Sequence, residues 1–409
     1  MEFLPIIYLG YMFVSIYFLS LFLFLYFRNK KNIFSYPEAK RKYSVSIVVP
    51  AWNEEATIKT TVEEILKSDY PGLKEVIVVD DGSTDNTLKI ARTLEKKYKK
   101  VKVYTKINEG SKAGPLNFAL KKVKSEIFGV VDADSYPRED AIRKMVGFFD
   151  DSKVGAVTCV FVPRNKNKFI EKIQSIEYNV IAFTRKLLDY VDAIYVTPGP
   201  LALYRKSALD KIGGFDTKNM TEDIEATWHL AYEGYQRRMC LSTKATTTVP
   251  IKFKQWYRQR RRWNIGGLQC INKYKKYFLK KGMLGAFILP FFILQLFLGL
   301  IGLSIFFYLI TTRFISNFLY TKYSVSVGTP LITMNDLSIT PSFLNYLGVT
   351  LFFAGVIFTI MVLYILKEEV LAKRNIFNLF FYFLFYLSIY PFIMISALYR
   401  FFRGGAKWR

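Results

Sequence analysis

Four long runs without a charged residue stand out along the chain, and one extended section of mixed apolar and polar residues separates the first from the other three. The runs are Leu4–Phe27, Gly282–Thr312, Leu337–Leu366 and Asn375–Tyr399. Each is longer than the roughly 20 residues that a helix needs to cross about 30 Å of hydrocarbon. The pattern therefore predicts a multi-pass membrane protein with about four spans.

Basic residues at both ends of the mixed section predict its side of the membrane. The letters RNKK follow the first run and NKYKKYFLKKG precede the second, and short segments rich in Lys and Arg stay in the cytosol. Three crossings after a cytosolic domain would, however, leave the basic tail RFFRGGAKWR on the outer side. The number of crossings therefore stays open, and a run that lies in the interface or re-enters the membrane would restore the expected orientation.

The mixed section has the alternating pattern of an α/β domain. The first strand-like run is YSVSIVVP, which precedes the helical pattern ATIKTTVEEILKSDY. Two further strand-like runs, which end in acidic residues, lie in LKEVIVVDD and EIFGVVDADSYP. This alternation predicts a mostly parallel sheet with helices on both faces. The expected division is a transmembrane helix over 1–27, a cytosolic domain over 28–249, an interfacial segment over 250–282, a membrane region of about three helices over 283–399 and a basic tail over 400–409.

Composition supports the membrane assignment and excludes one kind of metal site. Hydrophobic residues make up 51% of the chain and aromatic residues 17%, more than in a typical soluble protein. The net charge of +25 suits anionic lipid as well as nucleic acid, so charge alone does not choose between them. The cysteines, at 159, 240 and 270, lack paired metal spacing and are expected to be free thiols. A single histidine, His229, excludes a histidine-rich metal site.

Acidic residues follow three successive strands, in the letters PAWNEE, DDGSTD and DADSYP. Ligands of such sheets bind beyond the carboxyl ends of the strands. DDGSTD alone is equally typical of a capped turn, but the three ends together predict a binding site. Asp132 and Asp134 alternate along an extended segment, so their carboxylates face the same side and suit a divalent cation that bridges to a diphosphate. Lys112, in the turn NEGSKAGPLN, is either an exposed loop residue or a contact for phosphate or base.

Three later segments complete the candidate chemistry. The Pro-Gly-Pro turn in AIYVTPGPLALYRK either lines a pocket or leads tightly into a core strand. NMTEDIEATWHL begins a helix with Thr221 as N-cap and with Glu222, Asp223 and Glu225 in its first turns. WYRQRRRWNIGG sets four arginines between tryptophans, a pattern that fits a nucleic-acid patch, an interfacial belt or a phosphate clamp.

In this order, the motifs VVPAWNEE, VDDGSTD, DAD, TED and QRRRW resemble the family 2 glycosyltransferases. Within that family the chain is similar to the processive membrane synthases of cellulose, chitin, hyaluronan and poly-N-acetylglucosamine. The likeness covers about residues 43–270 together with the membrane layout. It implies a GT-A fold and an inverting transfer from a UDP-sugar, with Mg²⁺ or Mn²⁺ as cofactor.

The resemblance also implies a role for each matched residue. Asp223 would be the general base that takes a proton from the acceptor hydroxyl, and Asp134 would hold the metal. The implied substrate-binding residues are Pro50, Ala51, Asn53 and Glu54 near the base, Asp81 at the uridine, Lys112 and Asp132 at the nucleotide, Glu222 beside the general base, Gln259 and Arg262 at the diphosphate, and Trp263 under the acceptor sugar. Trp256, Arg258, Arg260 and Arg261 are not fixed by the motif and are expected to be interfacial or packing residues.

Two local likenesses indicate the donor. RWNIGG resembles the poly-N-acetylglucosamine synthases and GPLALYRK the hyaluronan and chitin synthases, and both imply UDP-N-acetylglucosamine. The expected partners are this donor, a growing glycan or lipid-linked acceptor, membrane lipid and, because four spans are few for a glycan channel, an accessory membrane protein or a second copy. No nucleic-acid partner is expected.

Two alternatives remain at this point. One is a single transfer to a lipid or polyprenyl-phosphate acceptor. The other is a membrane-tethered basic scaffold or nucleic-acid binder, which would not need Asp132, Asp134 or Asp223.

Overall fold

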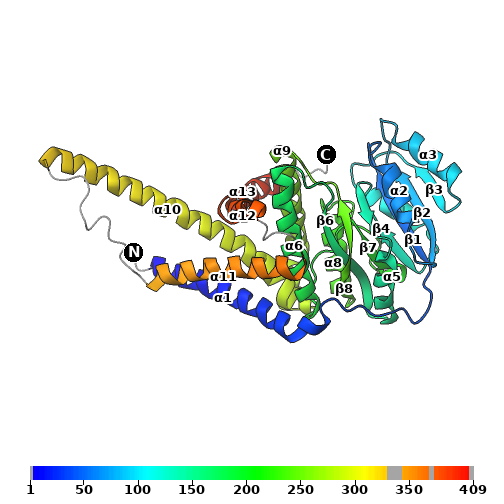
Figure 1. Cartoon of the computed structure of the whole chain (residues 1–409), viewed down its shortest axis with the longest axis horizontal. Helices are drawn as coiled ribbons and strands as arrows, with labels where there is room; N and C mark the ends of the chain where they lie inside the picture. The colour runs from blue at the N-terminus through cyan, green and yellow to red at the C-terminus, as the bar shows by residue number, and fades with distance from the viewer. Residues whose placement is uncertain (1–2, 329–342, 368–372, 405–409) are drawn as a thin grey trace.

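The computed structural model describes residues 3–328, 343–367 and 373–404. An eight-stranded sheet with the order β3-β2-β1-β4-β7-β6-β8-β5 lies in the right-hand part of the molecule as drawn in Figure 1. The strands are β1 (Val45–Ala51), β2 (Leu73–Asp80), β3 (Val101–Thr105), β4 (Ile127–Val130), β5 (Ser135–Pro137), β6 (Val154–Pro163), β7 (Ala202–Arg205) and β8 (Gln236–Thr247). Strands β3, β2, β1 and β4 are parallel, β6 and β8 are parallel, and β7 is antiparallel to both of its neighbours. The predicted mostly parallel α/β sheet is confirmed.

The parallel strands are β-branched runs because helices cover both of their faces. Alternate residues of β1 point to opposite sides, so Ile47 and Val49 enter one apolar core and Val48 enters the other. The helices of the domain are α2 (Ile58–Leu66), α3 (Thr87–Lys97), α4 (Ala113–Leu120), α5 (Ala141–Val146), α6 (Phe169–Asp189), α7 (Lys206–Lys211), α8 (Glu222–Tyr232) and α9 (Phe253–Tyr274). The carboxyl ends of β1, β2 and β4 therefore open on the same edge of the sheet, as predicted.

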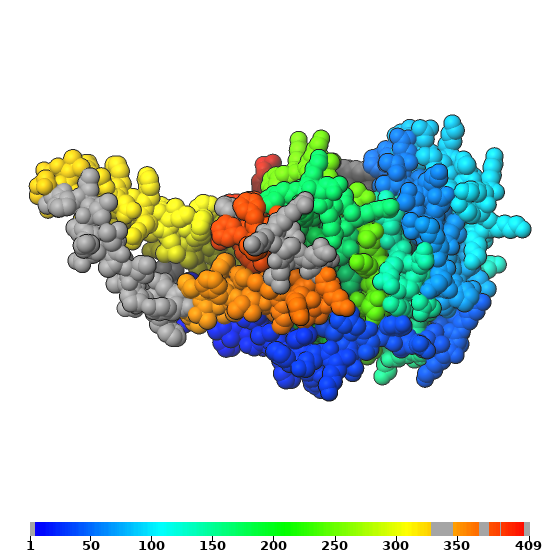
Figure 2. Space-filling model, in the orientation of Figure 1, coloured from blue at the N-terminus to red at the C-terminus, as the bar shows by residue number. Residues whose placement is uncertain are grey.

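Among the described residues, three helices are long and apolar enough to cross a membrane, over Pro5–Asn32, Leu284–Val327 and Leu347–Ile365. They correspond to α1 (Phe3–Asn29), α10 (Leu289–Val327) and α11 (Phe343–Ile365). Figures 1 and 2 show them extending together from one side of the α/β domain. Phe18 and Phe22 of α1 join them by ring contacts to Phe291 of α10 and Phe358 of α11. Helix α10 continues beyond the predicted end at Thr312, and the start of the predicted Leu337–Leu366 run lies outside the described residues.

The last apolar run is not one straight helix. It forms α12 (Lys373–Phe381), a π-helical turn (Tyr382–Tyr386) and α13 (Leu387–Phe402). These helices are long and apolar enough to cross a membrane only when taken together, as a pair bent by 40°. Helix α13 runs alongside α9, where Tyr386 packs on Trp256 and Ala397 on Ile265. At the other end, Phe381 packs on Phe169 at the start of α6. Both ends of the bent pair therefore lie against helices of the α/β domain.

Candidate active site

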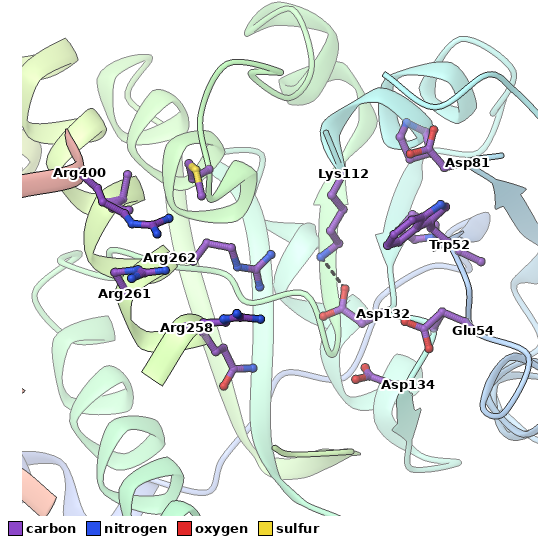
Figure 3. A pocket seen from close by; sticks show the side chains of 17 residues that line it. Trp52, Glu54, Asp81, Lys112, Asp132, Asp134, Arg258, Arg261, Arg262 and Arg400 are labelled. Carbon is purple, nitrogen blue, oxygen red and sulfur yellow. Dashed lines mark ion pairs between the residues drawn. The ribbon is translucent and has the colours of Figure 1, made fainter. Parts of the chain in front are cut away.

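A cavity of about 690 Å³ opens at the carboxyl ends of β1, β2 and β4, with α9 and the end of α13 as its opposite wall (Figure 3). Its lining residues are Pro50, Ala51, Trp52, Glu54, Asp81, Lys112, Pro115, Asp132, Ala133, Asp134, Met220, Arg258, Gln259, Arg261, Arg262, Ile265 and Arg400. The volume lies in the range that holds small molecules and cofactors. Most of the residues predicted from the motifs therefore meet around one cavity.

Four of the predicted residues are not part of the lining: Asn53, Glu222, Asp223 and Trp263. Asn53 instead joins two loops, because its Oδ1 accepts a hydrogen bond of 2.8 Å from the backbone N–H of Thr84. Its φ of 55° is in the left-handed region, which asparagine tolerates better than most residues. The structure thus places Asn53 where it shapes the loop that carries Trp52 and Glu54.

Carboxylates form the wall on the sheet side. Burial, the largest cause, and the neighbouring carboxylates of Asp132 and Glu54 together raise the pKa of Asp134 to about 7. Burial likewise raises the pKa of Glu54. Such crowding of carboxylates favours a bound cation, because a positive charge would relieve their mutual repulsion.

Lys112 lies within this acidic group. Its Nζ is 2.5 Å from Oδ1 of Asp132 and 2.9 Å from Oε1 of Glu222. Burial lowers the pKa of Lys112, but Asp132 and Glu222 outweigh burial and hold it above its usual value. Lys112 therefore carries a positive charge and connects the end of β4 to the start of α8. Only 17% of its side chain is exposed, so the alternative of an exposed loop lysine is excluded.

The Pro-Gly-Pro turn packs directly against this ion pair. A Cβ at Gly199 would lie 2.5 Å from Oδ1 of Asp132 and 2.7 Å from Nζ of Lys112. The backbone N–H of Asp132 also donates to the carbonyl of Gly199 at 3.0 Å. The turn leads into the core strand β7, which was one of the two predicted readings, and only glycine leaves room there for the ion pair.

Helix α8 carries the Thr-Glu-Asp motif at its N-terminus. Thr221 is the N-cap residue of α8, as predicted, but its hydroxyl donates to Oδ1 of Asn219 at 3.1 Å and makes no capping bond to the helix. Asp223 is half-buried. Burial, the largest cause, and the adjacent Glu222 raise its pKa to about 7, while Lys112 opposes this rise. A carboxylate with a pKa near the working pH is suited to accept a proton.

Helix α9 forms the opposite, basic wall. Arg258, Arg261 and Arg262 line the cavity, and Figure 3 shows their guanidinium groups across from the carboxylates. The expectation that Arg258 and Arg261 are interfacial or packing residues is therefore wrong. Residues three or four apart share a face of a helix, so the spacing 258, 261, 262 and 265 was the sequence signal for this face. Arg400, at the end of α13, joins the same wall and had no signal in the motifs.

The other face of α9 is structural, as expected for Arg260 and Trp256. The guanidinium of Arg260 is fully buried and pairs with the carboxylate of Glu177 on α6, with Nε 3.0 Å from Oε1. It also lies 4.2 Å from the ring centroid of Trp263, and Trp263 packs on Tyr178. Trp263 is thus held behind the cavity wall.

Gly266 sets the distance between the basic wall and the start of α8. A Cβ at this position would lie 1.9 Å from Oγ1 of Thr221. The two helices therefore cross at a separation that only glycine permits. This contact fixes α9 relative to Asp223, two residues after Thr221.

The donor set fits a cation that takes most of its ligands from a substrate. No cluster of three or more His, Cys, Asp or Glu side chains that could hold a metal occurs within the described ranges. Mg²⁺ and similar ions often bind through one or two carboxylates together with substrate phosphates. Asp134 beside Asp132 meets that requirement.

Comparison with known proteins identifies the family. Residues 46–213 match the family described as Glycosyl transferase family 2. The poly-β-1,6-N-acetyl-D-glucosamine synthase of Staphylococcus epidermidis is 31% identical over 325 residues, which cover 77% of this chain and 78% of that protein. The chain belongs to glycosyltransferase family 2. This glycosyltransferase is therefore an enzyme of the hexosyltransferase class, as the motifs predicted.

Further relatives agree with this assignment. The synthase of the same description from Staphylococcus aureus strain COL is 31% identical over 268 residues, or 63% of this chain and 64% of that one. A solved mannosyltransferase from Pyrobaculum calidifontis, in complex with GDP-Man and Mn²⁺, superposes with a TM-score of 0.56 at 18% identity, covering 96% of this glycosyltransferase and 98% of that chain. At that identity the likeness shows the shared fold.

Proposed function

We propose that this glycosyltransferase polymerises N-acetylglucosamine from UDP-N-acetylglucosamine into a β-1,6-linked polysaccharide, processively and with passage of the chain across the membrane. The observation that carries the proposal is the 31% identity to poly-β-1,6-N-acetyl-D-glucosamine synthase over 325 residues. A match of that length is longer than the α/β domain, so it includes part of the membrane region. The likeness to the synthase therefore extends over both the catalytic domain and part of the membrane region.

The cavity has the parts that a UDP-sugar requires. Trp52 and Asp81 line the cavity just beyond the ends of β1 and β2 and would contact the uridine. The diphosphate would lie between Asp134 and the guanidinium of Arg262, whose planar fork suits phosphate oxygens. Mg²⁺ or Mn²⁺ held at Asp134 would supply positive charge to the departing diphosphate.

The acceptor side of the reaction is assigned to α8 and α9. Asp223 takes the proton from the acceptor hydroxyl as this oxygen attacks the anomeric carbon, which inverts the configuration there. Its half-buried carboxylate, with a pKa of about 7, is a stronger base than an exposed aspartate. Lys112 pairs with the adjacent Glu222 at 2.9 Å and so orients the start of α8. Trp263, which does not line the cavity, supports the wall of α9 from behind by packing on Tyr178.

In this proposal the protein lies in the cell membrane and its catalytic domain lies in the cytosol. Helices α1, α10 and α11 cross the membrane in this proposal, whereas α12 and α13 lie along α6 and α9 at the interface. The tail after α13 then stays on the side of the catalytic domain. This arrangement removes the conflict between three C-terminal crossings and a basic tail.

The proposal is tested by UDP release from the purified full-length protein against a panel of UDP- and GDP-sugars with Mg²⁺ or Mn²⁺, with gel sizing of the product. We expect release only with UDP-N-acetylglucosamine, a polymeric product, and loss of both in Asp223→Asn. Asp210→Asn, at an exposed ion pair on α7, is the matched control. A single sugar added to lipid would instead indicate the single-transfer reaction, and a preference for a GDP-sugar would refute the proposed donor.

A further inference from the structure

Three arginines of the basic wall gather without a carboxylate partner. Arg258 and Arg261 of α9 and Arg400 of α13 all line the cavity, and none of the three makes an ion pair with a carboxylate among residues 3–328, 343–367 and 373–404. Burial lowers the pKa of Arg261, and the like charges of Arg400 and Arg258 lower it further. Guanidinium groups held together in this way are mutually repulsive unless an anion binds between them.

The position of Arg400 depends on how α13 packs. Its helix follows α9, and Ala397 and Phe401 belong to the same apolar cluster as Ile265 and Leu268 of α9. These two residues of α13 flank Arg400 along the chain. They direct the end of the helix to the cavity, where Figure 3 shows the Arg400 side chain pointing toward Arg261 and Arg262.

A buried polar network fixes the other end of α13. The carboxylate of Glu177 on α6 accepts hydrogen bonds from the hydroxyls of Tyr386, at 2.6 Å, and of Tyr390. The same carboxylate pairs with Arg260 of α9. Glu177 thus joins α6, α9 and α13 at one point, and a buried network of this kind holds its members in one arrangement.

We propose that α13 is part of the donor site: Arg400 binds the diphosphate of the nucleotide together with Arg261 and Arg262, and the Glu177 network holds it there. The inference rests on the proposed function, because the diphosphate is that of the UDP donor and of the UDP product. It adds a binding residue from the C-terminal helix to the motif residues of α9. Donor affinity then depends on the docking of that helix.

The shape and charge of the cavity favour a nucleoside diphosphate over other anions. A volume of about 690 Å³ holds a nucleotide-sized ligand. The carboxylates of Asp132 and Asp134 on the facing wall would repel an anion that arrives without a cation. A diphosphate satisfies both walls, because it can bind a divalent cation on one side and guanidinium groups on the other.

The test compares Arg400→Ala with Arg403→Ala in the full-length, detergent-purified protein. Arg403 is exposed and does not line the cavity, and its Cζ lies 4.6 Å from the ring centroid of Tyr399. Its removal is therefore a control for the loss of one positive charge near the end of α13. Binding of UDP, GDP and uridine is measured with Mg²⁺ present. We expect Arg400→Ala to weaken UDP binding by about tenfold or more, as for a lost charge-assisted hydrogen bond, with uridine affinity unchanged. Arg403→Ala should bind like the parent, and Arg400→Lys should recover part of the loss.

Each result separates the inference from the donor assignment. Equal UDP affinity in Arg400→Ala and Arg403→Ala would overturn the role of Arg400, and so would an equal loss of UDP and uridine. If the parent binds GDP in place of UDP, the proposed donor is refuted and the arginine comparison is decided with GDP. If no nucleoside diphosphate binds to the folded parent, both the inference and the proposed function are overturned.

The Glu177 network is tested by removing hydroxyls while keeping the rings. Tyr386→Phe and Tyr390→Phe, combined, should lower UDP affinity by about threefold to tenfold, as expected for two lost hydrogen bonds that hold α13. Tyr364→Phe, on an exposed position of α11, is the control. Unchanged UDP affinity in the double variant would refute the dependence of the donor site on this network.

Discussion

The contact between Gly266 and Thr221 offers a sharp test of how the two sides of the site are held. In Gly266→Ala, the new Cβ would lie 1.9 Å from Oγ1 and 2.7 Å from Cγ2 of Thr221. An ordinary contact begins at about 3.4 Å, so α9 and the start of α8 would have to separate by about 1.5 Å. That movement carries Gln259 and Arg262 away from Asp223.

The expected effects follow from this displacement. Overpacking of a buried contact costs about 1–3 kcal/mol, and alanine regains about 1 kcal/mol over glycine within a helix. The free energy of unfolding should therefore fall by at most about 2 kcal/mol, and the protein should still fold. Because a displacement near 1 Å can cost about a hundredfold in rate, kcat should fall by about that factor.

Gly267→Ala is the matched control, one residue further along the same helix. Its Cβ would lie 3.5 Å from the ring of Phe292, an ordinary contact, so activity should persist and stability should rise slightly. The assay measures kcat and KM for UDP-N-acetylglucosamine together with the thermal unfolding midpoint of each variant. Equal kcat values for the two variants would refute the reasoning, since the close crossing at Gly266 would then have no bearing on catalysis.

Three further predictions concern the charges and contacts of the site. A general base must be unprotonated, so kcat/KM should rise with pH through a midpoint near the Asp223 pKa of about 7. In Glu222→Gln one like charge is lost, so the pKa of Asp223 falls and the midpoint of the pH profile should shift to lower pH. An unmoved or raised midpoint would contradict the assignment of Asp223 as the base. Asp134→Asn should raise the Mn²⁺ concentration needed for half-maximal activity by tenfold or more, about 1.4 kcal/mol, while UDP binding in EDTA stays close to that of the parent; equal metal dependence would remove Asp134 as the metal ligand. Gly199→Ala places a Cβ 2.5 Å from Oδ1 of Asp132 and should disturb the ion pair between Asp132 and Lys112. KM for the donor should rise by at least the factor by which kcat falls. An unchanged KM would show that this ion pair is not needed for donor binding.

The fold could be predicted because its signals are local. Each parallel strand is a β-branched run that ends in acidic or turn residues, and each is followed by a helical pattern. The antiparallel position of β7 between β4 and β6 depends on pairing between distant segments. Periodicity within a segment does not carry that information.

Most of the motif residues line the cavity, as the sequence predicted, but Asn53, Glu222, Asp223 and Trp263 do not, and some lining residues lie outside the motifs. Arg258 and Arg261 share a helical face with Arg262, so their position can be predicted from the sequence once the segment is taken as a helix. Arg400 reaches the cavity only through the packing of α13 on α9, a contact between segments about 140 residues apart in the chain. Gly199 and Gly266 are likewise explained by close approaches in space.

The central claim is processive synthesis of an N-acetylglucosamine polymer, and the most direct measurement is the length distribution of the product at early times. The full-length protein in lipid vesicles would be given UDP-N-acetylglucosamine in large excess, and the reaction stopped while most donor remains. The proposed function predicts long chains alongside unused donor from the earliest time points, and no product in Asp223→Asn. Products that all lengthen together by single sugars, or a lipid carrying one sugar, would contradict it.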